Sequence, residues 1–258
     1  ADIVLASDPD ADRLGCALPI PYVGWDSRPE ELALNGNQIG VILCHYILQS
    51  RTQSGRMPAK GLVAKTIVTT DLTGIVARSF GAQVVDNLLV GFKYIGAVIE
   101  NLPDDAEFLF GTEESHGYLS GSFVRDKDAA SAAILLAECA ASLKTQGLTL
   151  REYLDTIYKT HGYFREIQKS TFREGAQGNR EIAQIMAGLR ENPPVEIGSR
   201  EVHEVVDHQL GQGCNLISGE EREVIGDRGN VMAFTFTEAG NTRVTARPSG
   251  TEPKIKFY

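Results

Sequence analysis

The stretch GLVAKTIVTTDLTGIVARSFGAQVVD, residues 61–86, decides the fold. Residues 61–69 are apolar and β-branched and predict a buried strand, and residues 82–86 predict a second strand. Between them, the spacing of apolar residues predicts a helix over 71–80 that Asp71 can cap at its N-terminus. A strand, a helix and a strand in this order are typical of a sheet covered by helices.

The same alternation continues on both sides of this stretch. Strands are predicted at 3–7, 14–18 and 107–110, and helices at 37–50, 92–101 and 126–146. Further along, helices are predicted at 149–160 and 179–191, and strands at 163–172, 201–206, 231–236 and 242–247. The sequence therefore predicts the α/β class, with a three-layer α/β/α domain followed by a smaller α+β domain that has an antiparallel sheet.

The composition excludes several classes of protein. The 258 residues include 25 basic and 34 acidic side chains, for a net charge of −9, which disfavours a nucleic-acid binder. No apolar run reaches the roughly 18 residues that span a bilayer, and we expect no membrane partner. The four cysteines (Cys16, Cys44, Cys139 and Cys214) are widely spaced, which favours free thiols and a cytoplasmic protein.

The first chemical motif is the aspartate loop, residues 8–13, with the sequence DPDADR. Asp8, Asp10 and Asp12 alternate after an apolar strand and can converge on one Mg²⁺, a cation that prefers oxygen ligands. Arg13 can hold a phosphoryl group with two parallel hydrogen bonds. An EF-hand is excluded because Arg13 stands where that loop needs glycine. The alternative is a solvated acidic turn.

The second motif is the glutamate loop, residues 111–118, with the sequence GTEESHGY. Glu113 and Ser115 are suited to sugar hydroxyls, which both donate and accept hydrogen bonds. His116 is a candidate catalytic residue or a structural histidine. A turn with solvated glutamates is the alternative for the whole motif.

The third motif is the arginine loop, residues 247–254, with the sequence RPSGTEPK. A guanidinium, two hydroxyls and flexible backbone N–H groups suit a phosphate, and they come from Arg247, Ser249, Gly250 and Thr251. An ordinary hairpin turn is the alternative.

Two helix starts complete the candidate site. Gly91 and Lys93 open one predicted helix, where backbone donors favour anions. Lys127 opens another, and its place near the positive helix end predicts a pKa lowered towards the proton-transfer range, although Asp126 and Asp128 oppose this shift. A surface lysine is the alternative.

The three loops, in this order, resemble those of the α-D-phosphohexomutases, which include phosphoglucomutase and phosphomannomutase. Asp8-x-Asp10-x-Asp12-Arg13 resembles the magnesium loop of that family. Gly111-x-Glu113-Glu114-Ser115 resembles its sugar-binding loop, and Arg247-x-Ser249-Gly250-Thr251-Glu252-Pro253 its phosphate loop. The pair Glu113-Glu114 before Ser115 favours the glucose-type branch, so the substrate expected from the resemblance is a hexose phosphate.

The resemblance implies domains and roles. Residues 1–18 correspond to the tail of the family's second domain, 19–145 to its third, 146–159 to a hinge and 160–258 to an incomplete fourth. The implied reaction passes a phosphoryl group between a phosphoserine and the sugar through a bisphosphate intermediate. Asp8, Asp10 and Asp12 would hold Mg²⁺. Arg13, Lys127 and His116 would be catalytic, and Gly91, Lys93, Glu113, Ser115, Arg247, Ser249, Gly250 and Thr251 would bind substrate.

This sequence departs from the family pattern at two places. The family's phosphoserine segment, of the type Ser-His-Asn-Pro, is absent from these 258 residues. We therefore expect the chain to be a fragment and to have no mutase turnover by itself. Val90 stands where the family often has Thr, which affects one sugar contact.

Three alternatives remain on the sequence alone. Phosphomannomutase or another phosphosugar mutase of the same family shares the three loops. A phosphosugar-binding module without catalysis would use the same contacts. A phosphatase of the haloacid dehalogenase type, with Asp8 as nucleophile, is disfavoured because it needs Thr or Val where Asp12 stands. The oligomeric state does not follow from the sequence.

Overall fold

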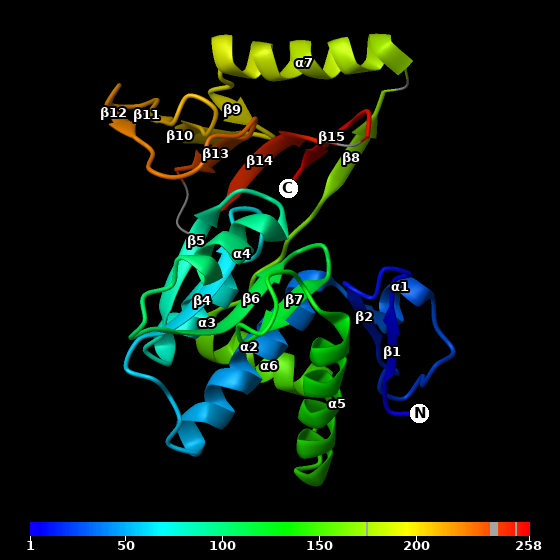
Figure 1. Cartoon of the computed structure of the whole chain (residues 1–258). Coiled ribbons are helices and arrows are strands. Elements are labelled where there is room, and N and C mark those ends of the chain that lie inside the picture. The colour runs from blue at the N-terminus through cyan, green and yellow to red at the C-terminus, as the bar shows by residue number, and fades with distance from the viewer. Residues whose placement is uncertain (174, 238–241, 251) are drawn as a thin grey trace. The chain divides into compact units, whose positions relative to one another are not determined.

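The chain divides into two compact units, Ala1–Arg165 and Glu166–Tyr258, in a computed structural model that describes every residue except 174, 238–241 and 251 (Figure 1). The predicted fold class is confirmed, because a three-layer α/β/α domain is followed by a domain with an eight-stranded antiparallel sheet. Within the described residues, no helix combines the length and apolar character needed to cross a membrane.

The larger sheet of the first unit has the strand order β5-β4-β6-β7. Its strands are β4 (Gly61–Thr66), β5 (Gln83–Leu88), β6 (Glu107–Glu113) and β7 (Gly117–Ser120). Strand β4 is parallel to β5 and β6, and β7 is antiparallel to β6. Because β4, β5 and β6 are parallel, the loops that follow them lie at one edge of the sheet, where ligands bind in open α/β folds.

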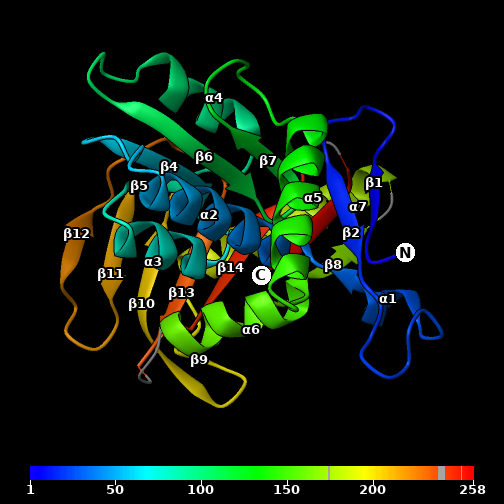
Figure 2. The same ribbon diagram turned by 90° about the horizontal axis from the view of Figure 1, so that it is seen from below.

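Helices cover both faces of this sheet (Figure 2). One core lies between the sheet and a layer formed by α2 (Gly36–Gln53), α3 (Asp71–Ser79), α5 (Ala129–Thr145) and α6 (Leu150–His161). The other lies under α4 (Phe92–Glu100). Side chains alternate along β4 as expected for a strand buried on both faces, since Val63 belongs to the first core and Ala64 to the second.

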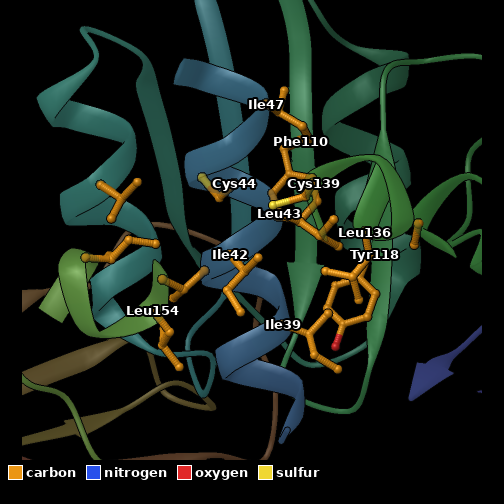
Figure 3. Packing of buried hydrophobic residues seen from close by; sticks show 14 of the residues in the cluster. Ile39, Ile42, Leu43, Cys44, Ile47, Phe110, Tyr118, Leu136, Cys139 and Leu154 are labelled. Carbon is orange, nitrogen blue, oxygen red and sulfur yellow. The ribbon is translucent and has the colours of Figure 1, made fainter. Parts of the chain in front are cut away.

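Helix α2 lies at the centre of the larger core (Figure 3). Its apolar residues pack with side chains of β6, β7, α5 and α6, a cluster that includes Ile39, Ile42, Leu43, Cys44, Ile47, Phe110, Tyr118, Leu136, Cys139 and Leu154. All four cysteines are free thiols. Because α2 is surrounded by these contacts, its N-terminus is fixed at the sheet edge that carries the glutamate loop.

The first 34 residues form a small antiparallel sheet of β1 (Val4–Ser7), β2 (Leu14–Ala17) and β3 (Ala33–Leu34), with the short helix α1 (Pro29–Leu32) before β3. Leu14, Cys16 and Leu34 are buried in the same core as α2. The aspartate loop joins β1 to β2, so this shared core attaches it to the α/β/α domain.

The helix that the sequence predicts at 149–160 is present as α6, within the segment for which the resemblance implies a hinge at 146–159, and the hinge stays a prediction. Helix α6 begins after Thr149, whose side chain accepts a hydrogen bond from the Glu152 N–H in a capping box. Its apolar face, Leu150, Tyr153, Leu154 and Ile157, is buried in the core of the first unit. The two compact units meet between Arg165 and Glu166.

The second unit is built on one antiparallel sheet with the order β12-β11-β10-β13-β14-β15-β8, and β9 pairs with β10. The strands are β8 (Lys169–Phe172), β9 (Glu196–Ile197), β10 (Arg200–Asp207), β11 (Gln212–Asn215), β12 (Glu221–Glu223), β13 (Met232–Phe236), β14 (Arg243–Pro248) and β15 (Lys254–Phe257). Helix α7 (Gly175–Glu191) buries Ile182 and Met186 against Phe234 and Ile255 of the sheet. This arrangement places the arginine loop between β14 and β15.

We predict that Gly36→Ala destabilises the first unit by roughly 1–3 kcal/mol, because a Cβ at Gly36 would lie 2.0 Å from the carbonyl oxygen of Glu114. Trp25, the single tryptophan, reports unfolding of this unit by its fluorescence in urea. As a control, Gly188→Ala on α7 meets nothing within 4 Å and should stabilise the second unit by about 0.5–1 kcal/mol, measured by circular dichroism in urea because Trp25 lies in the first unit. Equal effects of the two substitutions would contradict the close contact.

Candidate functional site

The aspartate loop is shaped by one of its own carboxylates. Oδ1 of Asp8 accepts hydrogen bonds from the backbone N–H groups of Asp12 and Arg13, at 3.2 and 3.1 Å. Burial acts to raise the pKa of Asp8, but these N–H donors outweigh it and hold the pKa below its usual range. Ala11 closes the turn with a φ of 55°. Asp8 is therefore ionised and directed into its own loop.

The three aspartates differ in their surroundings. Asp10 is exposed, whereas the Asp12 carboxylate lies 2.9 Å from the ammonium of Lys127. Oδ1 of Asp12 is buried and has no hydrogen-bond partner, while Nε of Arg13 lies 3.6 Å away. Among the residues that the structure describes, no three His, Cys, Asp or Glu side chains are gathered as a metal site. The predicted ligands therefore share a loop without converging.

The glutamate loop follows β6 and turns directly into β7, and Glu113 pairs with Gly117 at the end of the ladder. Glu113 is only 4% exposed, and its Oε1 accepts a hydrogen bond of 2.8 Å from the N–H of Gly91. Burial, with the charge of Glu114 as a second cause, raises the pKa of Glu113 to about 7. This carboxyl group changes its charge near neutral pH.

The turn that is predicted to bind an anion also supports Glu113. Gly91 is the N-cap of α4 with a φ of 129°, a conformation that favours glycine. Its N–H is directed to the Glu113 carboxylate, and the neighbouring Lys93 is exposed, with its ammonium 4.9 Å from the ring centroid of Tyr94. The substrate contacts predicted for Gly91 and Lys93 stay predictions.

His116 and Ser115 complete the turn, and both are half-buried. His116 has a φ of 69°, its carbonyl accepts a hydrogen bond from the N–H of Leu14, and its Nδ1 lies 3.2 Å from the carbonyl oxygen of Leu14. Burial lowers the pKa of His116, so the imidazole is neutral at neutral pH. The histidine thus joins the glutamate loop to β2, next to the aspartate loop.

Lys127 has a raised pKa, contrary to the sequence-based prediction. Burial acts to lower this pKa, but hydrogen bonds and negative charge from Asp12 and Asp126 outweigh burial. The ammonium lies 2.9 Å from Asp12 and 3.1 Å from Asp126, and the side chain is 15% exposed. Asp12 comes from a distant segment, so the sequence around Lys127 did not indicate that the pKa of this lysine is raised.

Small residues let these segments approach closely. A Cβ at Gly117 would lie 2.7 Å from Cδ of Lys127 and 3.4 Å from Oε2 of Glu113. The hydroxyl of Tyr118 donates a hydrogen bond of 3.1 Å to the carbonyl of Gly36. The structure therefore brings together Asp12, Arg13, Gly91, Glu113, His116 and Lys127, all within the first unit.

Sequence reasoning missed Lys65, which lies on β4 beside Thr112 of β6. Its side chain is 1% exposed, and its ammonium donates to the Asp71 carboxylate at 2.9 Å and to the carbonyl of Thr69 at 3.1 Å. The sequence feature that could have revealed Lys65 is the presence of a lysine inside an otherwise apolar strand. The predicted cap is also corrected, because Thr70 is the N-cap of α3 and Asp71 pairs with Lys65.

The arginine loop belongs to the second unit. Arg247 is half-buried on β14 and pairs with Lys256 of β15. The N–H of Ser249 donates to the carbonyl of Lys254 at 2.8 Å, and Gly250 has open space around it. Thr251 lies outside the described residues. Arg247, Ser249 and Gly250 thus occupy one hairpin, and their binding of a phosphate stays a prediction.

We predict that Asp71→Asn lowers the free energy of unfolding of the first unit by on the order of 3 kcal/mol, because the buried Lys65 ammonium loses this carboxylate. Urea unfolding followed by Trp25 fluorescence measures the effect. The double variant Lys65→Met/Asp71→Asn should recover most of the loss, since it removes both charges. Additive losses in the double variant would show that the pair is not coupled.

We also predict that Glu113 makes the first unit less stable as the pH rises from about 4.5 to about 7. The raised pKa of about 7 means that the folded chain binds a proton that the unfolded chain has released in this range, so stability falls with rising pH. Urea unfolding at several pH values measures the free energy of unfolding. Between pH 4.5 and about 7 we expect it to fall by on the order of 3 kcal/mol more in the unmodified chain than in Glu113→Gln. A Glu113→Gln variant with the same pH profile would rule out the raised pKa.

Comparison with known proteins gives consistent matches. Residues 35–161 match the family description phosphoglucomutase/phosphomannomutase, alpha/beta/alpha domain III. A phosphoglucomutase of Staphylococcus aureus (strain N315) is 36% identical over 258 residues, which are 100% of this chain and 44% of that protein. The chain thus spans less than half the length of this curated relative.

Two solved structures share the fold. The phosphoglucomutase pp63/parafusin from Paramecium, in its open form, matches 99% of this chain and 40% of its own with a TM-score of 0.61 and 16% identity. The N-acetylphosphoglucosamine mutase of Aspergillus fumigatus, in complex with GlcNAc-6P and magnesium, matches 99% of this chain and 44% of its own with a TM-score of 0.51 and 14% identity. At such identities, these two likenesses concern the fold alone.

Proposed function

Because the chain belongs to the phosphohexomutase family, we propose that it forms part of a phosphoglucomutase, which interconverts glucose 1-phosphate and glucose 6-phosphate. The observation that carries the proposal is the 36% identity to a phosphoglucomutase over all 258 residues, which include the three loops. The proposed reaction is a phosphoryl transfer, which depends on positioning and charge neutralisation.

The sugar is assigned to the glutamate loop. Glu113 and Ser115 offer a carboxylate and a hydroxyl, which match the mixed donors and acceptors of a sugar. The N–H of Gly91 fixes one oxygen of Glu113, so the carboxylate has one orientation relative to the turn. Such a fixed acceptor supports selection between sugars that differ at one hydroxyl.

Magnesium is assigned to Asp8, Asp10 and Asp12. Their oxygens fit the cation in chemistry, and the buried Oδ1 of Asp12 without a hydrogen bond is an acceptor suited to it. The Aspergillus relative was solved with magnesium. When bound, the cation would neutralise charge on a transferring phosphoryl group.

The chain's own residues then have distinct tasks. Arg13, next to Asp8 and Asp12, would contact the transferring phosphoryl group, and Arg247 with Ser249, Gly250 and Thr251 would hold the phosphate that does not react. His116, neutral because of its lowered pKa, can accept a proton from a sugar hydroxyl, and Lys127 can donate one. We propose that the nucleophilic phosphoserine lies outside these 258 residues, so that the chain by itself has no turnover.

We predict that glucose 1-phosphate perturbs the amide signals of the arginine loop in NMR titrations of this chain. Arg247→Gln should weaken the affinity at least tenfold, because the guanidinium binds the phosphate oxygens. Arg180→Gln, an exposed arginine of α7 in the same unit, is the matched control and should leave the affinity unchanged. Equal loss in both variants would indicate a nonspecific charge effect.

The reaction is tested on a polypeptide of the relatives' full length that contains this chain. Conversion of glucose 1-phosphate should depend on Mg²⁺ and fall by at least a hundredfold in Asp10→Ala. Faster conversion of mannose, glucosamine or ribose 1-phosphate would assign another member of the family. Binding of all four without conversion, by a phosphorylated protein, would leave a phosphosugar-binding module.

A further inference from the structure

The ammonium of Lys127 joins two loops that lie far apart along the chain. It contacts Oδ2 of Asp12 at 2.9 Å and Oδ1 of Asp126 at 3.1 Å, and the side chain is only 15% exposed. We propose that Lys127 is a positioning residue that fixes the Asp12 carboxylate, and with it the aspartate loop, for a divalent cation. This inference rests on the proposed function, because it concerns the same aspartates.

The two oxygens of Asp12 have different environments. Oδ2 faces Lys127, whereas Oδ1 is buried without a hydrogen bond, and the Arg13 Nε at 3.6 Å lies beyond hydrogen-bond distance. A carboxylate that binds a metal through one oxygen is commonly oriented by a partner on the other. Lys127 occupies the orienting position and leaves Oδ1 available.

Lys127 is itself held on several sides. Its backbone N–H donates to Oδ1 of Asp126 at 2.8 Å, and its stem passes so close to Gly117 that a Cβ there would lie 2.7 Å from Cδ. Its ammonium lies 5.8 Å from the ring centroid of Phe92. A side chain already fixed in this way loses little further rotamer freedom when it orients a partner.

The backbone gives the contact a second, independent anchor. The N–H of Ala129, at the start of α5, donates to the carbonyl of Ala11 at 3.3 Å. Arg13 also forms an isolated antiparallel bridge with Gly117. The aspartate loop is thus placed beside the start of α5 by main-chain contacts, and Lys127 supplies the shorter of the two charged contacts of Asp12, at 2.9 Å against 3.6 Å for Arg13.

A positioning role has consequences that an acid–base role alone does not have. It predicts an effect on cation binding without any substrate, and an effect on the order of the aspartate loop without any cation. A proton donor that acts only during catalysis would change neither quantity.

The test uses the 258-residue chain and the variants Lys127→Met, Lys127→Arg and Lys159→Met, where Lys159 is an exposed lysine of α6. Amide hydrogen exchange of residues 8–13 reports loop order, and Mn²⁺ binding, followed by water-proton relaxation, reports cation affinity. We expect Lys127→Met to speed exchange in these residues and to lower Mn²⁺ affinity at least tenfold. Lys127→Arg should retain much of both properties, and Lys159→Met should behave as the unmodified chain does.

The outcomes separate this inference from the proposed function. Unchanged exchange in Lys127→Met, or tighter Mn²⁺ binding, would overturn the positioning role, and the latter would make Lys127 a competitor of the cation. Amide hydrogen exchange of residues 8–13 is enough by itself to test the contact between Lys127 and Asp12. If the unmodified chain binds no Mn²⁺ while Lys127→Met still speeds exchange, the contact stands and the magnesium assignment fails.

Discussion

The buried carboxylate of Glu113 is the constraint on which the rest of the candidate site depends. A buried charge needs donors or a proton, and Glu113 has one donor in the N–H of Gly91 and a pKa raised to about 7. Gly91 can present that N–H because it adopts a φ of 129°, which in turn fixes where α4 begins. The place of α4 and the orientation of Glu113 are therefore set together.

The turn around Glu113 is closed by contacts that leave no room for a Cβ at two glycines. Gly36, at the start of α2, lies against the carbonyl of Glu114, and Gly117 lies against Lys127. Leu14 of β2 bonds to the carbonyl of His116. Since α2 is the central helix of the core, the packing of the whole first unit determines the position of the glutamate loop, as a site built on rigid elements requires.

Much of this architecture could be predicted from local patterns. Apolar runs and helical spacing indicated β4, α3 and β5, and the three polar loops were recognised from their residue types. The pairing of Lys127 with Asp12 could not be predicted, because it depends on where two distant segments meet. The pair of Lys65 and Asp71 was missed for another reason: the two residues are close in sequence, but an aspartate at this position fits a helix cap as well as a buried ion pair.

The pattern Asp-x-Asp-x-Asp treats three residues alike, but the hairpin makes them unlike. Asp8 gives one oxygen to the backbone of its own loop, Asp12 gives one to Lys127, and Asp10 is exposed. The carboxylate oxygens of the three aspartates that remain available for a cation therefore differ in how firmly the fold orients them. Asp8 and Asp12 are already oriented by the fold, whereas Asp10 can adjust, so that a cation bound here would be approached by two fixed carboxylates and one that moves.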